Sequence, residues 1–181
     1  TPHDVQAALD RKDWAAAECL LRDKLTAAPD DPNLLFNLGV ATYRQNKWAE
    51  AEQCLLRAAD RGAGVQSWLL LGHVFAANRR YSEALRAYKA VLKAEPGHFE
   101  ALLALGDVRS RAGDRSGARE NYRQAAAAKP ADVDAALKYA ESLGEENPEI
   151  ALGMALGVLP RTGGDLRARA QHDRSRMRVD I

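Results

Sequence analysis

The sequence predicts an all-α solenoid, a stack of helix–turn–helix repeats. The dipeptide Leu-Gly occurs at Leu38-Gly39, Leu71-Gly72 and Leu105-Gly106, so the chain repeats every 33 to 34 residues. An alanine follows the same period, at Ala17, Ala51, Ala84 and Ala118, and the first three alanines follow an aromatic residue by three positions, at Trp14, Trp48 and Tyr81. A period of this length is typical of arrays in which each unit buries its apolar face against its neighbours.

The composition is compatible with one elongated domain that has almost no net charge. The chain has 181 residues, 28% of them charged, with a formal net charge of +1, which does not favour nucleic acid or a membrane surface as partner. No apolar run approaches the roughly 18 residues that a membrane-spanning helix needs. No charged-then-apolar leader starts the given sequence, and a removed leader or anchor stays open. The alanine- and arginine-rich usage is typical of a bacterial source, which leaves cytoplasm and periplasm open as compartments.

Residues 31–63 illustrate how each repeat divides into two helices. Asp31-Pro32 predicts a helix start, because aspartate caps the first turn and proline fits the first helical position. Apolar and small residues then recur at three- and four-residue spacing. Asn46-Lys47 interrupts this pattern, and a second helix is predicted to begin at Trp48 and to end at Gly62.

The same pattern divides the rest of the chain. A short helix from about Asp4 to Arg11 precedes the first aromatic–alanine helix, and Asp132 is expected to cap a late helix. The predicted segments are a partial repeat at 1–30, full repeats at 31–63, 64–97 and 98–131, a degenerate repeat at 132–160, and an arginine-rich capping helix or linker at 161–181.

No constellation of residues predicts catalysis, a cofactor or a metal. The chain lacks a glycine-rich loop between a strand and a helix, a nucleophile elbow and a CxxC pair. The four histidines have no metal-ligand spacing among themselves or with Cys19 and Cys54, which we expect to be small buried thiols. The sequence therefore predicts a protein that is not an enzyme.

The third repeat resembles a known family most closely. Its matching residues are Trp68, Leu71, Gly72, Phe75, Tyr81, Ala84, Tyr88 and Pro96. These are signature positions of the tetratricopeptide repeat family, and the resemblance covers roughly residues 4 to 130. It departs from the family at Thr42 and Arg109 (first-helix aromatic), Arg115 (turn aromatic) and Ala63 (closing proline). The resemblance implies a right-handed superhelical solenoid of about four to five helix–turn–helix repeats, in which the first helices line a concave groove.

Helical phase assigns a set of residues to that groove. The expected partner-binding residues are Phe36, Asn37, Val40, Tyr43, Arg44, Leu69, Leu70, His73, Leu103, Asp107 and Arg111. The middle of this set is apolar, and Asn37 is expected to hold the backbone of a ligand. The alternative is that these residues touch neighbouring units or a returning terminal segment and belong to the core.

The resemblance implies a protein-binding function. We expect an adaptor that binds a peptide or helix of a protein partner in its groove, without nucleic acid; homo-oligomerisation stays open. Two alternatives are a regulatory or targeting domain of a longer, transferase-like enzyme and a bacterial secretion or envelope-assembly chaperone. Chaperone-binding members of the family grip a C-terminal carboxylate with lysine, asparagine and arginine side chains. Only Asn37 matches that set, so this clamp is not expected.

Overall fold

The computed structural model of the chain describes residues 2–143. This part is entirely helical apart from its turns, as the sequence predicts. Its helices are α1 (Pro2–Asp10), α2 (Trp14–Ala27), α3 (Pro32–Arg44), α4 (Trp48–Asp60), α5 (Gly64–Ala77), α6 (Tyr81–Ala94), α7 (Phe99–Arg111), α8 (Arg115–Ala128) and α9 (Val133–Leu143). The second helix expected for the degenerate repeat and the arginine-rich segment at 161–181 lie outside the described residues.

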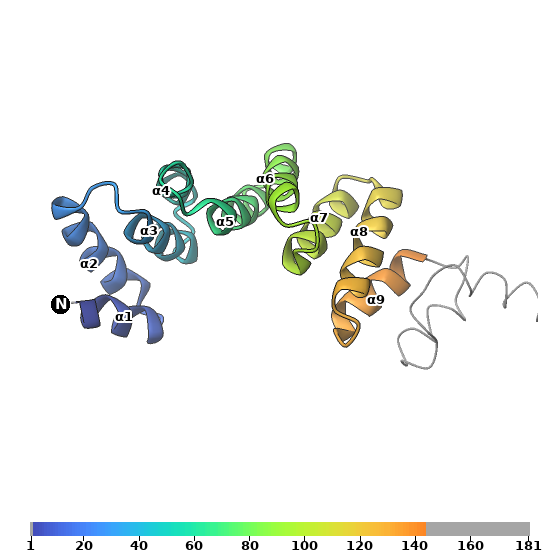
Figure 1. The fold of residues 1–181 in the computed structure, drawn as a ribbon, viewed down its shortest axis with the longest axis horizontal. Coiled ribbons are helices and arrows are strands. Elements are labelled where there is room, and N and C mark those ends of the chain that lie inside the picture. Colours follow the sequence, from blue (N-terminus) through green and yellow to red (C-terminus); the bar gives the residue numbers. More distant parts are fainter. Residues whose placement is uncertain (1, 144–181) are drawn as a thin grey trace, which may run out of the picture.

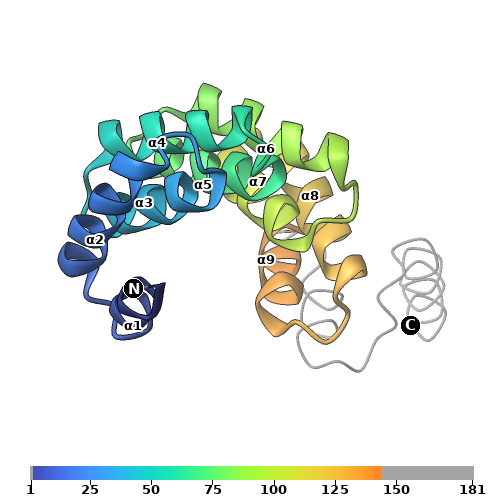
Figure 2. The same cartoon turned by 60° about the vertical axis from the view of Figure 1, so that its left-hand side comes forward.

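The helices stack in chain order into an arch (Figure 1). Each helix packs on the next one along the chain, and in addition α3 contacts α5 and α5 contacts α7. Figure 2 shows the arch in profile with its open side facing down, α3 and α5 along the inner edge and α4 and α6 along the outer edge. Helices on the inside of a curved stack lie closer together than those outside, so the direct α3–α5 and α5–α7 contacts agree with this view.

Side-chain caps fix where several helices begin. A carboxylate oxygen of Asp13, Asp31 and Asp114 accepts a hydrogen bond from a backbone N–H in the first turn of α2, α3 and α8, respectively. Asp132 caps α9 in the same way, 2.9 Å from the nitrogen of Ala135, as expected from the sequence. In α7 the Nδ1 atom of His98 takes this role, 3.3 Å from the nitrogen of Ala101.

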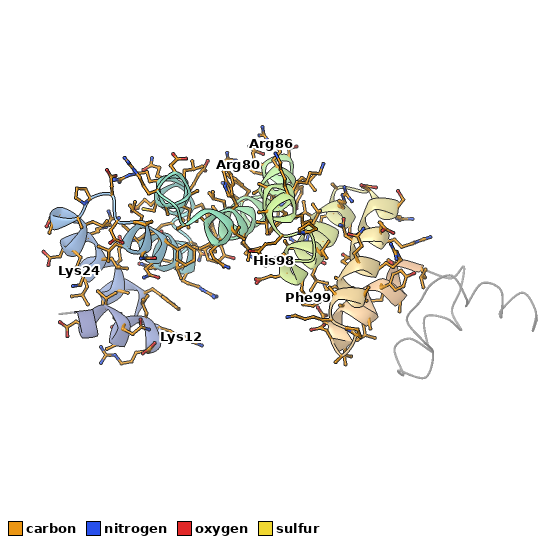
Figure 3. All side chains as sticks on the ribbon, in the orientation of Figure 1. Lys12, Lys24, Arg80, Arg86, His98 and Phe99 are labelled. Atoms are coloured by element: carbon orange, nitrogen blue, oxygen red, sulfur yellow. The ribbon has the colours of Figure 1, made fainter. Side chains whose placement is uncertain are left out.

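The turn within each helix pair uses one residue with left-handed backbone. These residues are Lys12, Asn46, Arg79 and Gly113, with φ angles of 57°, 60°, 59° and 84°. They lie 33 to 34 positions apart, so the turn repeats as regularly as the helices do. Left-handed backbone is unfavourable for most L-residues, and the lysine and arginine adopt it because the packed helices on both sides determine the turn. Figure 3 shows Lys12 at the end of α1.

The largest core cluster lies in the middle of the array and joins α4, α5, α6 and α7. It contains the fully buried Leu55, Leu71, Tyr88 and Val91. A smaller cluster joins α1, α2 and α3 around Leu21. Two others join α7, α8 and α9, one around Tyr122 and Tyr139 and the other around Leu102. The apolar interior of the described residues is therefore built from clusters that join neighbouring helices along the array, as expected for stacked repeats.

The two cysteines correct a sequence-based expectation. Cys19 is exposed and Cys54 is half-buried, so the prediction of two small buried thiols was wrong. Both are free thiols. On α2 the side chain of Glu18 points toward the neighbouring helices and is buried. Cys19 is the next residue along the helix, so its thiol points toward solvent. Burial raises the pKa of the Cys54 thiol, which keeps it protonated at neutral pH.

Glu18 is a nearly buried carboxylate that links three helices. Its side chain accepts hydrogen bonds from Arg22 within α2, from Gln45 at the end of α3 and from Lys47 at the start of α4. The Lys47 Nζ and Gln45 Nε2 atoms both lie 2.8 Å from its Oε2 atom. These bonds, that of Lys47 first, lower the pKa of Glu18 to about 2, against the opposing effect of burial. The carboxylate therefore stays ionised and joins the first two units.

Candidate partner-binding face

The surface formed by α3, α5, α7 and α9 on the inside of the arch is called the inner face here (Figure 2). Most of the residues that the sequence assigns to a groove lie on these helices with half-buried side chains: Phe36, Asn37, Val40, Tyr43, Leu70, His73, Leu103 and Asp107. Arg44 and Arg111 are exposed. Side chains from three successive first helices are therefore accessible along one side of the array.

Leu69 does not belong to this set. Its side chain is only 6% exposed and lies in the central core cluster, so its assignment to the groove was wrong. The reason is that α5 packs on α4, α6 and α7 and not only on α6, its partner in the repeat. More of the surface of α5 is therefore buried than the contact with α6 alone would bury. The next residue, Leu70, is only partly buried and packs against the central core cluster.

The apolar part of the inner face lies on α3 and α5. Phe36, Tyr43 and Leu70 are half-buried and pack against the central core cluster, which fixes their side chains from below. Val40 is also half-buried, but it lies outside the core clusters found in residues 2–143. Leu103 of α7 packs on both C-terminal clusters. These residues present anchored apolar surface rather than loose side chains.

Glycines let second-helix side chains reach the inner face. Tyr88 of α6 lies so close to Gly72 of α5 that a Cβ atom there would be 2.3 Å from the Cε1 atom of the ring. The Tyr88 hydroxyl passes this glycine and lies 2.9 Å from the Nδ1 atom of His73. The two rings meet edge to face with centroids 5.5 Å apart. The Nε2 atom of His73 lies 3.2 Å from Glu100 of α7. One histidine thus connects its own unit to the next.

The next unit repeats this arrangement with different chemistry. Tyr122 of α8 lies against Gly106 of α7, and its hydroxyl donates to the carboxylate of Asp107 at 2.8 Å. Asp107 follows Gly106 as His73 follows Gly72. The ammonium group of Lys138 on α9 donates to the same oxygen of Asp107 at 2.8 Å. Two polar bridges, from α5 to α7 and from α7 to α9, therefore run along the C-terminal half of the inner face.

The environment of His73 favours its neutral form. Burial lowers the pKa of its imidazole, and the positive charge of Arg44 lowers it further, while the neighbouring Glu100 acts in the opposite direction. In the neutral form Nδ1 accepts from the Tyr88 hydroxyl and Nε2–H donates to Glu100, so both ring nitrogens are satisfied. The phenol of Tyr88 has its pKa raised, mainly by burial, and stays protonated as this bond requires.

Arg44 marks the N-terminal end of the apolar region. Its guanidinium carbon lies 5.7 Å from the ring centre of Trp14 and 5.9 Å from that of Tyr43. Tyr43 in turn packs on Trp48, with ring centroids 5.6 Å apart. The cation is thus held on an aromatic shelf made of three rings from α2, α3 and α4. The sequence predicts an exposed Arg44 but gives no sign of this shelf.

A hollow that shares no residue with the expected groove lies between α2 and α4, where both meet α3. It has a volume of about 420 Å³ and is lined by Arg22, Leu25, Thr26, Leu35, Leu38, Glu50, Gln53, Cys54 and Arg57. Ion pairs to Glu18, Glu50 and Asp30 hold the two arginines.

Comparison with known proteins agrees with the repeat geometry. The family model described as the tetratricopeptide repeat matches residues 5–65, 69–113 and 103–145. The chain belongs to the tetratricopeptide repeat family. Members of this family are generally protein–protein interaction scaffolds, and the fold is generally non-catalytic. In residues 2–143 no helix is both long enough and apolar enough to span a membrane.

Similar tetratricopeptide repeat sequences occur in much longer proteins. The human cell division cycle protein 16 homolog is 29% identical over 119 residues, which is 60% of this chain and 19% of that protein. Cellulose synthase operon protein C of Pseudomonas fluorescens is 30% identical over 166 residues, 84% of this chain and 13% of that protein. The chain thus corresponds to less than a fifth of the length of each of these curated relatives.

Solved tetratricopeptide repeat structures share the fold. MamA from Desulfovibrio magneticus RS-1 superimposes with a TM-score of 0.77 at 18% identity, over 87% of this chain and 90% of that one. YrrB, described as a tetratricopeptide repeat protein with an unusual peptide-binding site, gives a TM-score of 0.68 at 17% identity, over 93% of this chain and 88% of that one. At these identities the likeness shows the common solenoid fold.

Proposed function

We propose that this protein is an interaction scaffold that binds a peptide or helical segment of a partner protein on its inner face. The observation that carries the proposal is the accessible apolar surface of α3 and α5, where Phe36, Tyr43 and Leu70 pack on the core and remain partly exposed. Anchored apolar side chains in a concave surface are a common basis for peptide recognition. In this proposal the protein has no catalytic activity of its own.

Two features describe how a ligand would be held. Val40 is a partly exposed apolar residue of α3, in the same helix as Tyr43 and Arg44, and would contact apolar ligand side chains. Asn37 is half-buried, one helical turn before Val40 on α3, and would bind ligand backbone through its amide. Because ordering and association offset much of the gain from burial, we expect dissociation constants around ~1 μM.

A second candidate function follows from the lengths of the relatives. Proteins such as cellulose synthase operon protein C contain similar sequence over only 13% of their length. This supports a role as the recognition part of a larger assembly, either a longer enzyme or a bacterial secretion or envelope-assembly factor. Both roles use the same inner face, so they differ in the partner rather than in the binding mode.

The test uses a matched pair of substitutions. A library of random 12-residue peptides is selected on the whole chain, and the best peptide is titrated by fluorescence anisotropy. Val40→Glu places a charge on the inner face, and Leu56→Glu places the same charge on α4, where Leu56 is 38% exposed. We expect Val40→Glu to weaken binding by about tenfold or more and Leu56→Glu to leave it unchanged. Equal effects of the two, with helical content intact in both, would rule the inner face out.

A further inference from the structure

Two neighbouring inner-face helices contain no acidic residue. The sequences of α3 and α5 include neither aspartate nor glutamate, and of their residues only Arg44 and His73 can carry a charge near neutral pH. The helices that follow on the same face differ, since α7 contributes Glu100 and Asp107 and α9 contributes Asp134 and Glu141. The inner face is therefore polarised along the array, and its apolar half is the half without negative side chains.

Arg44 is the one arginine or lysine in α3 and α5. Several arginines of other helices pair with a carboxylate: Arg22, Arg57, Arg80 and Arg123 pair with Glu50, Asp30, Glu52 and Glu120, respectively. Figure 3 shows Arg80 beside α6, on the outer edge of the arch. Arg44 is exposed, and across residues 2–143 no carboxylate pairs with it.

The aromatic shelf holds Arg44 without occupying its donors. The guanidinium carbon lies 5.7 Å and 5.9 Å from the ring centroids of Trp14 and Tyr43, and these cation–π contacts restrict the group. The rings offer no carboxylate to its N–H groups, which can donate in a fork that matches the carboxylate of a ligand. A cation restricted in this way loses less conformational freedom when it binds an anion than a freely moving one.

The nearest acidic groups of α7 are already engaged. Glu100 bonds to His73, and Asp107 accepts bonds from Tyr122 and Lys138. These contacts hold both carboxylates within bridges to other units. The unpaired positive charge of Arg44 therefore stands beside apolar surface without a compensating negative group from α3 or α5.

We infer that the α3–α5 half of the inner face binds a peptide segment that combines an acidic residue with apolar residues. A ligand carboxylate would pair with Arg44, and apolar ligand side chains would lie on Val40 and Leu70. This inference rests on the proposed function and specifies the chemistry of its ligand. A segment with a basic residue at the same place is disfavoured, because it would bring two unpaired cations together.

The experiment examines the peptides selected from the random library. Peptides selected on the wild-type protein should be enriched in Asp and Glu relative to the unselected library, next to Leu, Phe or other apolar residues. Replacing the selected acidic residue by its amide should weaken binding by about tenfold. The same loss is expected for Arg44→Gln, and combining both changes should cause little further loss. Binding should also weaken as ionic strength rises.

Arg111→Gln is the matched control, because Arg111 is also an exposed arginine in the last turn of an inner-face helix, but α7 contains acidic residues. It should change the affinity by less than about twofold. Peptides without acidic enrichment, or an Arg44→Gln protein that binds as tightly as the wild type, would overturn the inference. If Val40→Glu still weakens binding in that case, only the ligand chemistry is wrong; if Val40→Glu has no effect, the proposed function fails as well.

Discussion

Tyr88 of α6 packs against Gly72 of α5, and this packing lets the Tyr88 hydroxyl reach His73 of the inner face. Tyr88 is 1% exposed, so this core residue influences the candidate binding surface through its hydrogen bond to His73. Tyr122 and Gly106 repeat the relationship one unit later. Stability and the polar pattern of the inner face therefore depend on the same glycines.

Gly72→Ala should destabilise the protein by about 1–3 kcal/mol, because the added methyl group meets the buried ring of Tyr88. Chemical denaturation followed by circular dichroism measures this. Gly97→Ala is the control, since no atom lies within 4 Å of a Cβ atom at that position. Equal denaturation midpoints for the wild type and Gly72→Ala would contradict the packing described here.

Arg79→Gly should stabilise the protein by up to about 1 kcal/mol, since glycine adopts left-handed backbone without the steric conflict of a side chain. Arg79 is exposed at a φ of 59°, and Gly113 occupies the equivalent turn at 84°. Gly113→Ala should have the opposite effect, and thermal unfolding of both variants gives the signs. A lower melting temperature for Arg79→Gly would mean that its side chain supports the turn.

Glu18 should make stability depend on pH in acid. Its pKa is lowered from 4.5 to about 2 in the folded protein, by Lys47 first and then by Arg22 and Gln45. Its contribution is therefore complete above pH 4.5 and is lost as the pH falls from there to about 2. Glu18→Gln should be less stable than the wild type at pH 7 and should lose less stability across this range. Parallel urea titrations at neutral and acidic pH measure the difference.

His73 should titrate below the usual histidine pKa of 6.5. Glu100→Gln should lower its pKa further, because Glu100 favours the protonated form, whereas Arg44→Gln should raise it. Because the folded pKa is the lower one, the contribution of His73 to stability is present above pH 6.5 and is lost as the pH falls through the folded pKa. Proton NMR of the imidazole ring during a pH titration measures the shifts. A raised pKa in Glu100→Gln, or a lowered pKa in Arg44→Gln, would refute the charge environment described for the inner face.

The repeat pattern was sufficient to predict the helix pairs because each signature residue has a packing role. Gly39, Gly72 and Gly106 each face a second-helix side chain that would collide with a Cβ atom, so the period of the glycines is the period of the helix contacts. The predicted first helix, from Asp4 to Arg11, differs from the observed α1 by only one or two residues at each end.

The details of the inner face could not be predicted in the same way. Helical phase separates Leu69 from Leu70 by only 100°, and contacts with neighbouring units decide which of them is buried. The Glu18–Arg22 spacing indicates an ion pair within a helix, but the bonds from Gln45 and Lys47 cross between units. The same is true of Asp107 and Lys138, which are 31 residues apart.

The central claim is that a partner segment binds the inner face along α3 and α5. The most direct measurement is an amide NMR titration of the whole chain with the peptide of highest affinity from the library. The largest chemical-shift changes are predicted at Asn37, Val40, Leu70 and His73. Changes concentrated instead at Gln53, Cys54 and Arg57, around the hollow between α2 and α4, would contradict the claim and assign binding to the outer side of the array.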